Sequence, residues 1–237
     1  MNKLIVVTGG TKGIGKAIVQ KFIENGFDVA VCARNQADLE SLKRELERVF
    51  TNNTVNIFKA DLSKKKDCDG FISFLKSLGN PVEVLVNNTG FYIPGQVISE
   101  EDGVLESMIS TNLYSAYNLT RGLVNEMISR KNGHIFNICS IASIIPYPNG
   151  GSYSISKYAM YGMTQVLREE LKPHGIKVTA VLPGATRTAS WDGFADSLPE
   201  DRLMDPADVA ELIYSTYSLS ARSVVEEIII RPQLGDL

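Results

Sequence analysis

The stretch that decides the fold is the glycine-rich turn 8-TGGTKGIG-15. It follows the apolar, β-branched run 3-KLIVVT-8 and precedes residues 13–25, which have a helical pattern. Glycines let the backbone turn tightly and let phosphate oxygens approach, while the helix N-terminus offers free N–H groups and a positive dipole end. A strand, such a turn and a helix in this order therefore predict a phosphate-binding turn. The alternative is a turn that only packs the helix on the strand.

Outward from this turn, short apolar runs alternate with longer helical stretches. The strand-like runs are 3–8, 28–33, 55–60, 82–87, 134–139, 177–182 and 226–231, and the helical stretches are about 13–25, 36–50, 64–78, 100–130, 152–172 and 206–219. Most of the runs are apolar on both faces, as in parallel strands that helices cover on both sides. The pattern predicts an α/β, Rossmann-like, doubly wound fold with a seven-stranded parallel sheet flanked by helices on both faces.

The 237 residues show no internal repeat and no linker, so we expect one dinucleotide-binding and catalytic domain over residues 1–237. The least regular segment is 184–205, which holds the only tryptophan. Connections of this length in a compact domain are usually functional lids or disordered. We expect a substrate lid around 184–205.

Composition and charge exclude several classes of protein. The net charge is −3 and the pI is near 5.5, which gives no electrostatic footprint for nucleic acid or an anionic membrane. The three cysteines are far apart without CxxC spacing, which fits reduced thiols. Two histidines without ligand spacing argue against a metal site. With no signal peptide or membrane span in the pattern, we expect a cytoplasmic protein.

The spacing TGxxxGxG resembles the short-chain dehydrogenase/reductase family, whose members are single-domain nicotinamide enzymes. The resemblance runs from residue 3 to about residue 232. It implies that Gly9, Gly13 and Gly15 bind the cofactor phosphates. The residues of the turn expected to bind the cofactor are Gly9, Thr11, Lys12, Gly13, Ile14 and Gly15.

The second strand lacks the acid that an NAD site usually has at its end. That place reads 31-VCARNQ-36, with Ala33 and then Arg34. A guanidinium attracts a 2′-phosphate and binds it bidentately, and Lys12 adds a second positive charge nearby. Asn35 is a further candidate for this phosphate. The pattern, which marks NADP preference in the family, predicts NADP(H); the alternative is two solvated surface cations.

Two further matches place the rest of the cofactor. The stretch 60-ADLS-63 resembles the family's adenine-contacting pair, here Asp61 and Leu62, although Asp61 could instead start the next helix electrostatically. The stretch 87-NNTG-90 resembles the family's Asn-Asn-Ala-Gly. It implies Asn88 and Gly90 as cofactor neighbours, while Asn87 is expected to tie the central strands together.

The stretch 151-GSYSISKYAMYGM-163 carries Tyr153 and Lys157 at i and i+4, on one face of a helix. An ammonium near a phenol favours the phenolate, which lowers a pKa that is otherwise about 10. The pair is therefore a candidate proton donor to a carbonyl oxygen. Alone, this spacing more often means a packed tyrosine and a solvated lysine.

Two polar residues change that interpretation. Ser140 ends the run 135-IFNICS-140, at the edge of the sheet where ligands bind, and its hydroxyl can donate to a carbonyl. Ser143 is a competitor, but position and spacing favour Ser140. Asn112 is a polar residue on an apolar helical stripe; it is either a satisfied buried amide or an amide that holds a water next to Lys157. Together these residues resemble the family's Asn-Ser-Tyr-Lys tetrad.

The resemblance implies a reaction. Hydride passes from NADPH to a carbonyl carbon, Ser140 polarises the carbonyl, Tyr153 gives the proton, Lys157 holds the nicotinamide ribose, and Asn112 supports a water. The stretch 183-PGATRT-188 resembles the family's Pro-Gly-x-x-x-Thr. It implies nicotinamide or phosphate contacts from Pro183, Gly184, Thr186 and Thr188.

The sequence therefore predicts an NADP(H)-dependent oxidoreductase that reduces a carbonyl to an alcohol. The run from Pro183 to Trp191 looks more like sepiapterin-like and short carbonyl reductases. A 3-oxoacyl carrier-protein reductase is an alternative, although the Gly-Gly pair usual near its C-terminus is missing from 228-IIIRPQLGDL-237. A dinucleotide-sensing regulator without turnover is a remote alternative. Helices 104–128 and 153–171 are apolar on more than one side, which indicates a homodimer or homotetramer, or crowding inside one subunit.

Overall fold

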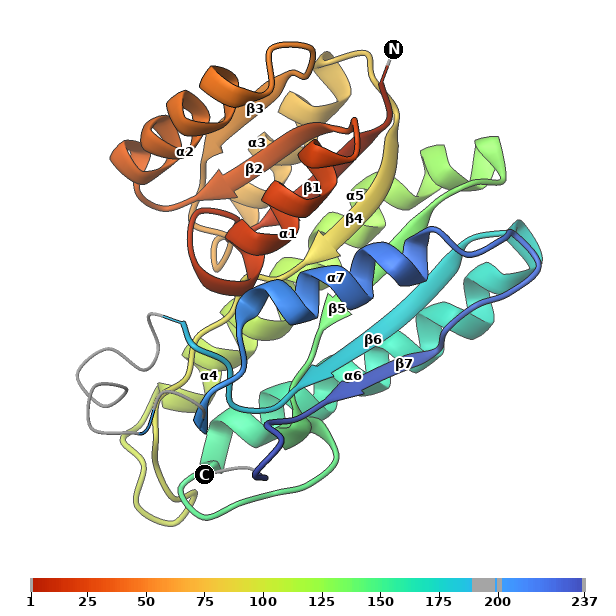
Figure 1. Cartoon of the computed structure of the whole chain (residues 1–237). Coiled ribbons are helices and arrows are strands. Elements are labelled where there is room, and N and C mark those ends of the chain that lie inside the picture. Colours follow the sequence, from red (N-terminus) through yellow and green to blue (C-terminus); the bar gives the residue numbers. More distant parts are fainter. Residues whose placement is uncertain (1, 189–198, 200–201, 236–237) are drawn as a thin grey trace.

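The computed structural model describes residues 2–188, 199 and 202–235. Its seven strands form one parallel sheet in the order β3-β2-β1-β4-β5-β6-β7 (Figure 1). The strands are β1 Leu4–Thr8, β2 Asp28–Ala33, β3 Val55–Lys59, β4 Val82–Asn87, β5 His134–Ile138, β6 Lys177–Pro183 and β7 Glu227–Ile230. This confirms the predicted fold class.

The strand order places the site. The chain builds β1, β2 and β3 outward in one direction, then returns to pair β4 with the other edge of β1. In open α/β sheets ligands bind at such a switch point, outside the carboxyl ends of the strands. The glycine-rich turn after Thr8 and the segment after Asn87 start side by side there.

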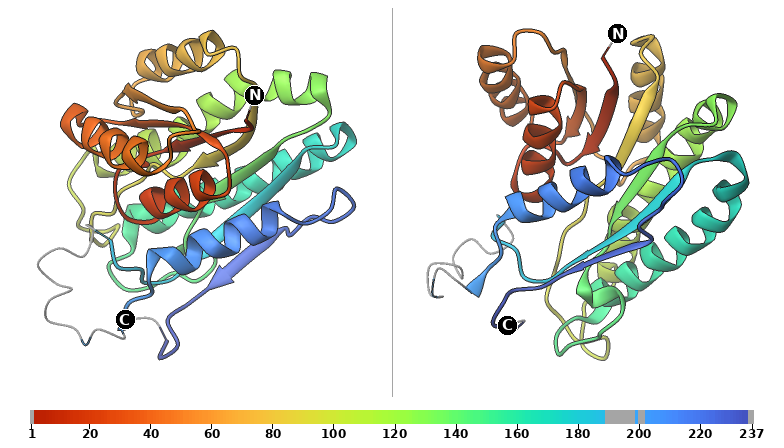
Figure 2. Two further views of the ribbon diagram at one scale, coloured as in Figure 1. Left: turned by 45° about the horizontal axis from the view of Figure 1, so that its top comes forward. Right: turned by 45° about the vertical axis from the view of Figure 1, so that its right-hand side comes forward.

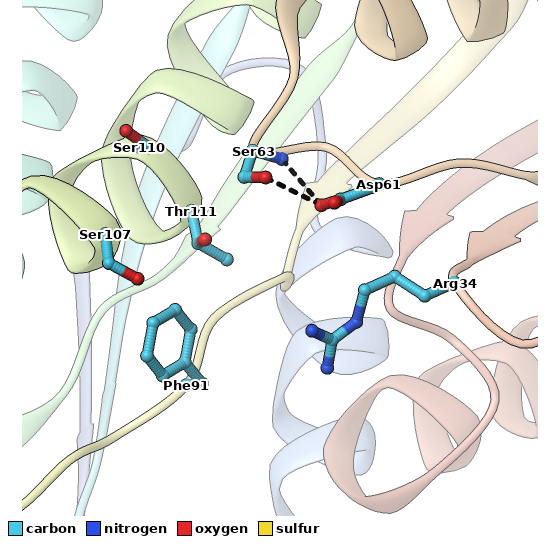
Figure 3. A pocket seen from close by; sticks show the side chains of 7 residues that line it. All are labelled: Arg34, Asp61, Ser63, Phe91, Ser107, Ser110 and Thr111. Carbon is cyan, nitrogen blue, oxygen red and sulfur yellow. Dashed lines mark hydrogen bonds between the residues drawn. The ribbon is translucent and has the colours of Figure 1, made fainter.

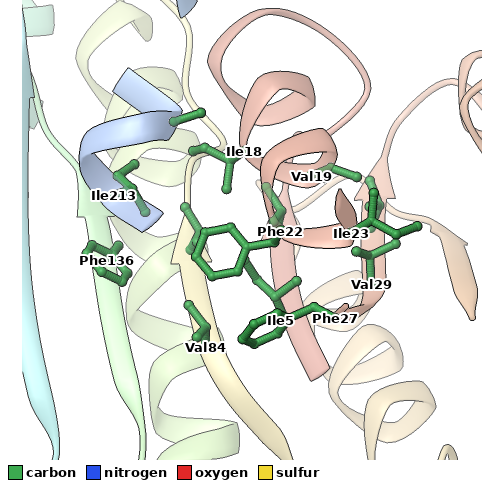
Figure 4. Packing of buried hydrophobic residues seen from close by; sticks show 14 of the residues in the cluster. Ile5, Ile18, Val19, Phe22, Ile23, Phe27, Val29, Val84, Phe136 and Ile213 are labelled. Atoms are coloured by element: carbon green, nitrogen blue, oxygen red, sulfur yellow. The ribbon is translucent and has the colours of Figure 1, made fainter. Parts of the chain in front are cut away.

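Helices cover both faces of the sheet, as the two views in Figure 2 show. On one face lie α1 (Gly13–Glu24), α2 (Gln36–Val49) and α7 (Pro206–Tyr217). On the other lie α3 (Lys65–Ser77), α5 (Ser115–Arg130) and α6 (Gly151–Leu171). In the first layer Phe22 of α1 packs on Ile5 of β1, between Ile213 and Phe27 (Figure 4). Because β1 and β4 are buried along their whole length, their sequences are apolar at nearly every position.

The helical stretch expected at 100–130 differs in two ways. It begins only at Val104, because Gly103 has a left-handed φ of 91°. It is also not one α-helix: α4 (Val104–Ile109) is followed by the π-helical turn η1 (Ser110–Tyr114) and then α5. Such π turns inside helices occur frequently at functional sites. Asn112 lies in the middle of η1.

The described residues also include two short 3-10 helices, η2 (Ile141–Ser143) after β5 and η3 (Lys172–His174) after α6. Most of the expected lid at 184–205 lies outside the described residues. The described residues at its two ends are joined, since Thr186 pairs with Met204 as an isolated bridge and Met204 N donates to Ala185 O at 3.0 Å. Among the described residues, no helix is long and apolar enough to cross a membrane.

Candidate active site

The glycine-rich turn leads directly from β1 into α1. Gly9 and Gly13 have left-handed φ angles of 63° and 52°, and Gly9 N donates to Cys32 O at 2.9 Å. No side chain caps the N-terminus of α1, and its first turn has no acidic residue. The first N–H groups of this helix therefore face the edge of the sheet with a positive dipole end, which suits a phosphate.

Asn88 holds this turn in place. Its Nδ2 donates to Thr8 O at 2.9 Å and to Gly9 O at 3.2 Å, and its N–H donates to Thr8 Oγ1. A Cβ at Gly15 would lie 2.5 Å from both Asn88 Nδ2 and Gly9 O, so only glycine fits there. Both amide hydrogens of Asn88 are used within the protein, where they support the turn predicted to bind the cofactor.

Asn87 has the role that we expected. Its Nδ2 donates to Asn137 Oδ1 at 2.8 Å and to Thr120 Oγ1 at 3.1 Å. These buried bonds join β4 to β5 and to α5, which confirms that Asn87 ties the central strands together.

The segment after β6 reaches the glycine-rich turn. A Cβ at Gly13 would lie 2.8 Å from Thr188 Cγ2, so these two predicted cofactor residues are neighbours. Pro183 ends β6, and the Thr186 hydroxyl donates to Gly184 O at 3.0 Å. The residues predicted from 183-PGATRT-188 thus lie at the same edge as the turn.

An open pocket of about 450 Å³ lies beside the ends of β2 and β3 (Figure 3). It is lined by Arg34, Asp61, Ser63, Phe91, Ser107, Ser110 and Thr111. The Asp61 carboxylate accepts from the Ser63 hydroxyl at 2.7 Å, which is the main reason that its pKa is lowered. Leu62 is buried in the core under the sheet, so its side chain packs instead of facing the pocket. The three hydroxyl residues of α4 and η1 and Phe91 carry no motif in the sequence, so only the fold reveals them.

Two of the polar residues expected at the 2′-phosphate have other contacts. Lys12 Nζ lies 3.0 Å from Asp38 Oδ2, an exposed ion pair. Asn35 caps α2, because its Oδ1 accepts from Ala37 N and Asp38 N. Arg34 is exposed and lines the pocket.

Lys157 of α6 lies beside Tyr153 and reaches the last residue of β5. Lys157 is only 5% exposed, its Nζ donates to Ile138 O at 2.9 Å, and it lies 5.8 Å from the centre of the Tyr153 ring. The lysine is therefore fixed near the phenol and is not a solvated surface cation. Ser140 lies two residues beyond the end of β5, and its Oγ accepts from Ala142 N. Ser143 is fully buried, and its Oγ accepts from Ser140 N, so it helps to fix the backbone of Ser140.

Asn112 is fully buried, and its side-chain amide is hydrogen-bonded within the protein. Its Nδ2 donates to Phe91 O at 3.1 Å and to Ser156 Oγ at 2.9 Å, while its Oδ1 accepts from Phe91 N. Both amide hydrogens are used, so this is the satisfied buried amide of the two alternatives. Its position is still close to the lysine, since a Cβ at Gly90 would lie 3.2 Å from Asn112 Oδ1 and 3.5 Å from Lys157 Nζ.

Two further tyrosines, Tyr92 and Tyr147, lie on one side of Tyr153 and carry no motif in the sequence. The Tyr92 ring meets the Tyr153 ring edge-on at 5.0 Å, and the Tyr147 ring lies 6.5 Å from Tyr92. Burial raises the pKa of both Tyr92 and Tyr147, so these two phenols stay neutral in the physiological range. They form an uncharged aromatic wall beside Tyr153.

Several known proteins are similar to this chain. Sepiapterin reductase from Chlorobaculum tepidum is 31% identical over an alignment of 248 positions, which covers 100% of this chain and 99% of that protein. The 3alpha-hydroxysteroid dehydrogenase of Mediterraneibacter gnavus is 29% identical, over 96% of this chain and 94% of its own. The crystal structure of a metagenomic short-chain oxidoreductase in complex with NADP has a TM-score of 0.84 and 28% identity, and covers 98% of this chain and 97% of that one.

The sheet order, the uncapped glycine-rich turn and the Tyr153–Lys157 pair at one edge agree with these likenesses. A family model described as short chain dehydrogenase matches residues 3–197, which is most of the chain. The protein is therefore an oxidoreductase that belongs to the short-chain dehydrogenase family.

Proposed function

We propose that the protein reduces a carbonyl compound to an alcohol with NADPH. The observation that carries the proposal is the buried Lys157, which Ile138 O holds beside Tyr153. A buried lysine near a phenol, at the carboxyl edge of a doubly wound sheet, suits proton transfer. A regulator that only senses a dinucleotide would not need a buried lysine beside a tyrosine hydroxyl.

The residues of the turn fit a dinucleotide. The uncapped N-terminus of α1 offers N–H groups to a phosphate, and the tight space at Gly15 lets the backbone approach it. When bound, the cofactor supplies a hydride to the carbonyl carbon. Tyr153 donates a proton to the carbonyl oxygen, and the Ser140 hydroxyl donates a hydrogen bond to the same oxygen. Lys157 provides the positive charge beside the phenol.

The preference for NADP(H) over NAD(H) is supported by Arg34. No carboxylate stands at positions 33–35, and the Arg34 guanidinium lines the pocket at the end of β2. Structures similar to this chain were solved with NADP, including the metagenomic oxidoreductase and the protein named ElxO. A guanidinium can bind the 2′-phosphate of NADP(H) through two charge-assisted hydrogen bonds. The 2′-hydroxyl of NAD(H) carries no charge and offers no such pair of acceptors.

The substrate we propose is a compact ketone with a flat ring. Tyr92 and Tyr147 form the aromatic wall beside Tyr153, and aromatic pairs prefer edge-on or offset contacts such as a ring substrate can make. A 3-oxoacyl thioester on a carrier protein is the second candidate. Its acyl chain has no ring to place against this wall.

Turnover of NADPH tests the proposal. The panel contains 1-phenyl-1,2-propanedione, its cyclohexyl counterpart and an acetoacetyl thioester, each followed by loss of NADPH absorbance. We expect reduction of the phenyl diketone to exceed that of the cyclohexyl one, and Tyr153→Phe to lower kcat by at least about a hundredfold. The matched control is Tyr158→Phe, on the same helix but 42% exposed. Turnover that survives in Tyr153→Phe would contradict the mechanism, and preference for the thioester would favour the second candidate.

We also propose that two copies associate through α5 and α6. We further propose that the protein is cytoplasmic. Exposed apolar side chains follow α6 at Ile155, Tyr158 and Val166, and they continue on the neighbouring helix at Tyr114 and Tyr117. The three cysteines are free and buried, which fits a reducing compartment.

A further inference from the structure

The loop that follows β4 contacts the catalytic helix at both of its ends. At its start, Asn112 holds Phe91 through two hydrogen bonds and donates a third to Ser156 Oγ on α6. At its end, Glu100 Oε1 accepts from Ser152 N at 2.9 Å, and Glu100 Oε2 accepts from the Ser152 hydroxyl. Ser152 and Ser156 are one helical turn apart, and Tyr153 lies on the turn between them.

The middle of the loop is joined to the segment before α6. Gly95 N donates to Asn149 O at 3.0 Å, Gly95 pairs with Gly150 as an isolated bridge, and the Tyr92 hydroxyl also donates to Asn149 O. Asn149 has a left-handed φ of 61°, a conformation that asparagine tolerates better than most residues. Residues 91–100 and 147–152 therefore form one hydrogen-bonded unit, which we call the clasp.

Glu100 is the charged residue of the clasp, and its surroundings are close-fitting. Ser152 is 2% exposed, and a Cβ at Gly151 would overlap Glu100 Oε1. Both carboxylate oxygens accept hydrogen bonds at the positive end of a 21-residue helix. Charge-assisted bonds of this kind are stronger and shorter than neutral ones, so the carboxylate fixes the first turn of α6.

A helix cap elsewhere would only stabilise its helix, but here the capped residue precedes Tyr153. The same loop carries Tyr92, whose ring contacts the Tyr153 ring. We infer that Glu100 is a positioning residue, which sets the place of the Tyr153 hydroxyl and makes the clasp and the catalytic turn move together. This inference rests on the proposed role of Tyr153 in carbonyl reduction.

The kinetic test compares Glu100→Ala and Glu100→Gln with Glu101→Gln, a neighbouring exposed acid. A small displacement of the Tyr153 hydroxyl from its reacting position lowers the rate of the chemical step. We therefore expect Glu100→Ala to lower kcat by about ten- to a hundredfold. Glu100→Gln keeps one acceptor for Ser152 N and is expected to restore part of the rate. The Kd for NADPH stays within about twofold, since Glu100 lies away from the phosphate turn. Unchanged kcat in Glu100→Ala, or equal losses of kcat and NADPH affinity, would overturn the inference.

Amide hydrogen exchange supplies a readout that does not need activity. We expect Glu100→Ala to speed exchange of the amides at residues 152–156, while those of α1 keep the wild-type rate. Slow exchange at residues 152–156 in Glu100→Ala would overturn the inference. If the wild-type protein reduces no carbonyl, the proposed function fails, and exchange still decides whether Glu100 holds this turn.

Discussion

At the scale of single residues, Arg34 is the side chain that we propose selects the cofactor. Lys12 is paired with Asp38, and Asn35 is used as the cap of α2. The Asp61 carboxylate, which shares the pocket with Arg34, is bound into its own turn by Ser63. The Arg34 guanidinium is thus the group best placed to meet a 2′-phosphate.

Replacing Arg34 by alanine is expected to weaken NADPH binding at least about tenfold and to leave NADH binding nearly unchanged, since a hydrogen bond to a charged group contributes about 1.5–3 kcal/mol. Fluorescence titration with each dinucleotide measures the two Kd values. Arg48→Ala, at the far end of the neighbouring helix α2, is the control. An unchanged ratio of the two Kd values would show that Arg34 does not select the cofactor.

The sequence predicts which residues gather at the site better than it predicts what they contact. The need for glycine at position 15 follows from the motif, but its cause is the amide of Asn88, which is distant in sequence. The side chains of Asn88, Asn35 and Asn112 each bond the protein's own backbone, which no motif indicates. Such roles depend on which main-chain groups the fold leaves unpaired, and no local pattern reports that.

At the scale of elements, β5 carries a buried histidine. His134 stacks on Phe136 with ring centres 3.9 Å apart, and its Nε2 lies 2.8 Å from Thr179 Oγ1. The Thr179 hydroxyl donates to Val225 O, so it accepts from His134 Nε2. Burial, together with the nearby Lys177 charge, lowers the pKa of His134 to about 3.

The folded protein thus holds His134 neutral, whereas the unfolded chain takes up a proton below about pH 6.5. The contribution to stability is full above that pH and is lost as the pH falls towards the folded pKa. Between pH 7 and pH 5 this costs the wild-type protein about 2 kcal/mol. Urea denaturation at both pH values measures the loss, and His134→Gln is expected to lose about 2 kcal/mol less. Equal losses in the two proteins would mean that His134 also titrates freely in the fold.

Most elements were predicted within one to three residues, because long runs of buried strand and amphipathic helix leave clear patterns. The π-helical turn was not. Residues 110–114 read STNLY, which is compatible with ordinary helix, and the wider turn is stabilised by contacts of Asn112 with Phe91 and Ser156. Tertiary bonds decide the winding there.

At the scale of the whole molecule, the stripe on α6 is the feature that the single chain does not explain. Ile155, Tyr158, Gly162 and Val166 follow one another at helical spacing, and a Cβ at Gly162 would meet no atom within 4 Å. Exposed apolar stripes of this kind mark protein interfaces. A glycine on the stripe allows two helices to approach closely.

We therefore expect Val166→Asp, which places a charge on this stripe, to convert the assembled protein to monomers because a buried unpaired charge is costly. Sedimentation velocity measures the mass. The control is Val49→Asp, because Val49 is similarly exposed, at 62% against 57%, but lies at the end of α2. A wild-type protein that is already monomeric, or a Val166→Asp protein of unchanged mass, would contradict the proposed interface.

The π turn at Ser110–Tyr114 has a consequence for the gene. A helix that runs from α4 through this turn into α5 contains one residue more than regular α-helical winding accommodates. Loss of a single codon there would restore regular α-helical hydrogen bonding and would remove the wider turn that holds Asn112. The helix would gain regularity while Asn112 lost its place under Phe91. Insertions and deletions in these five codons are therefore constrained by the site, even though the helix alone would tolerate them.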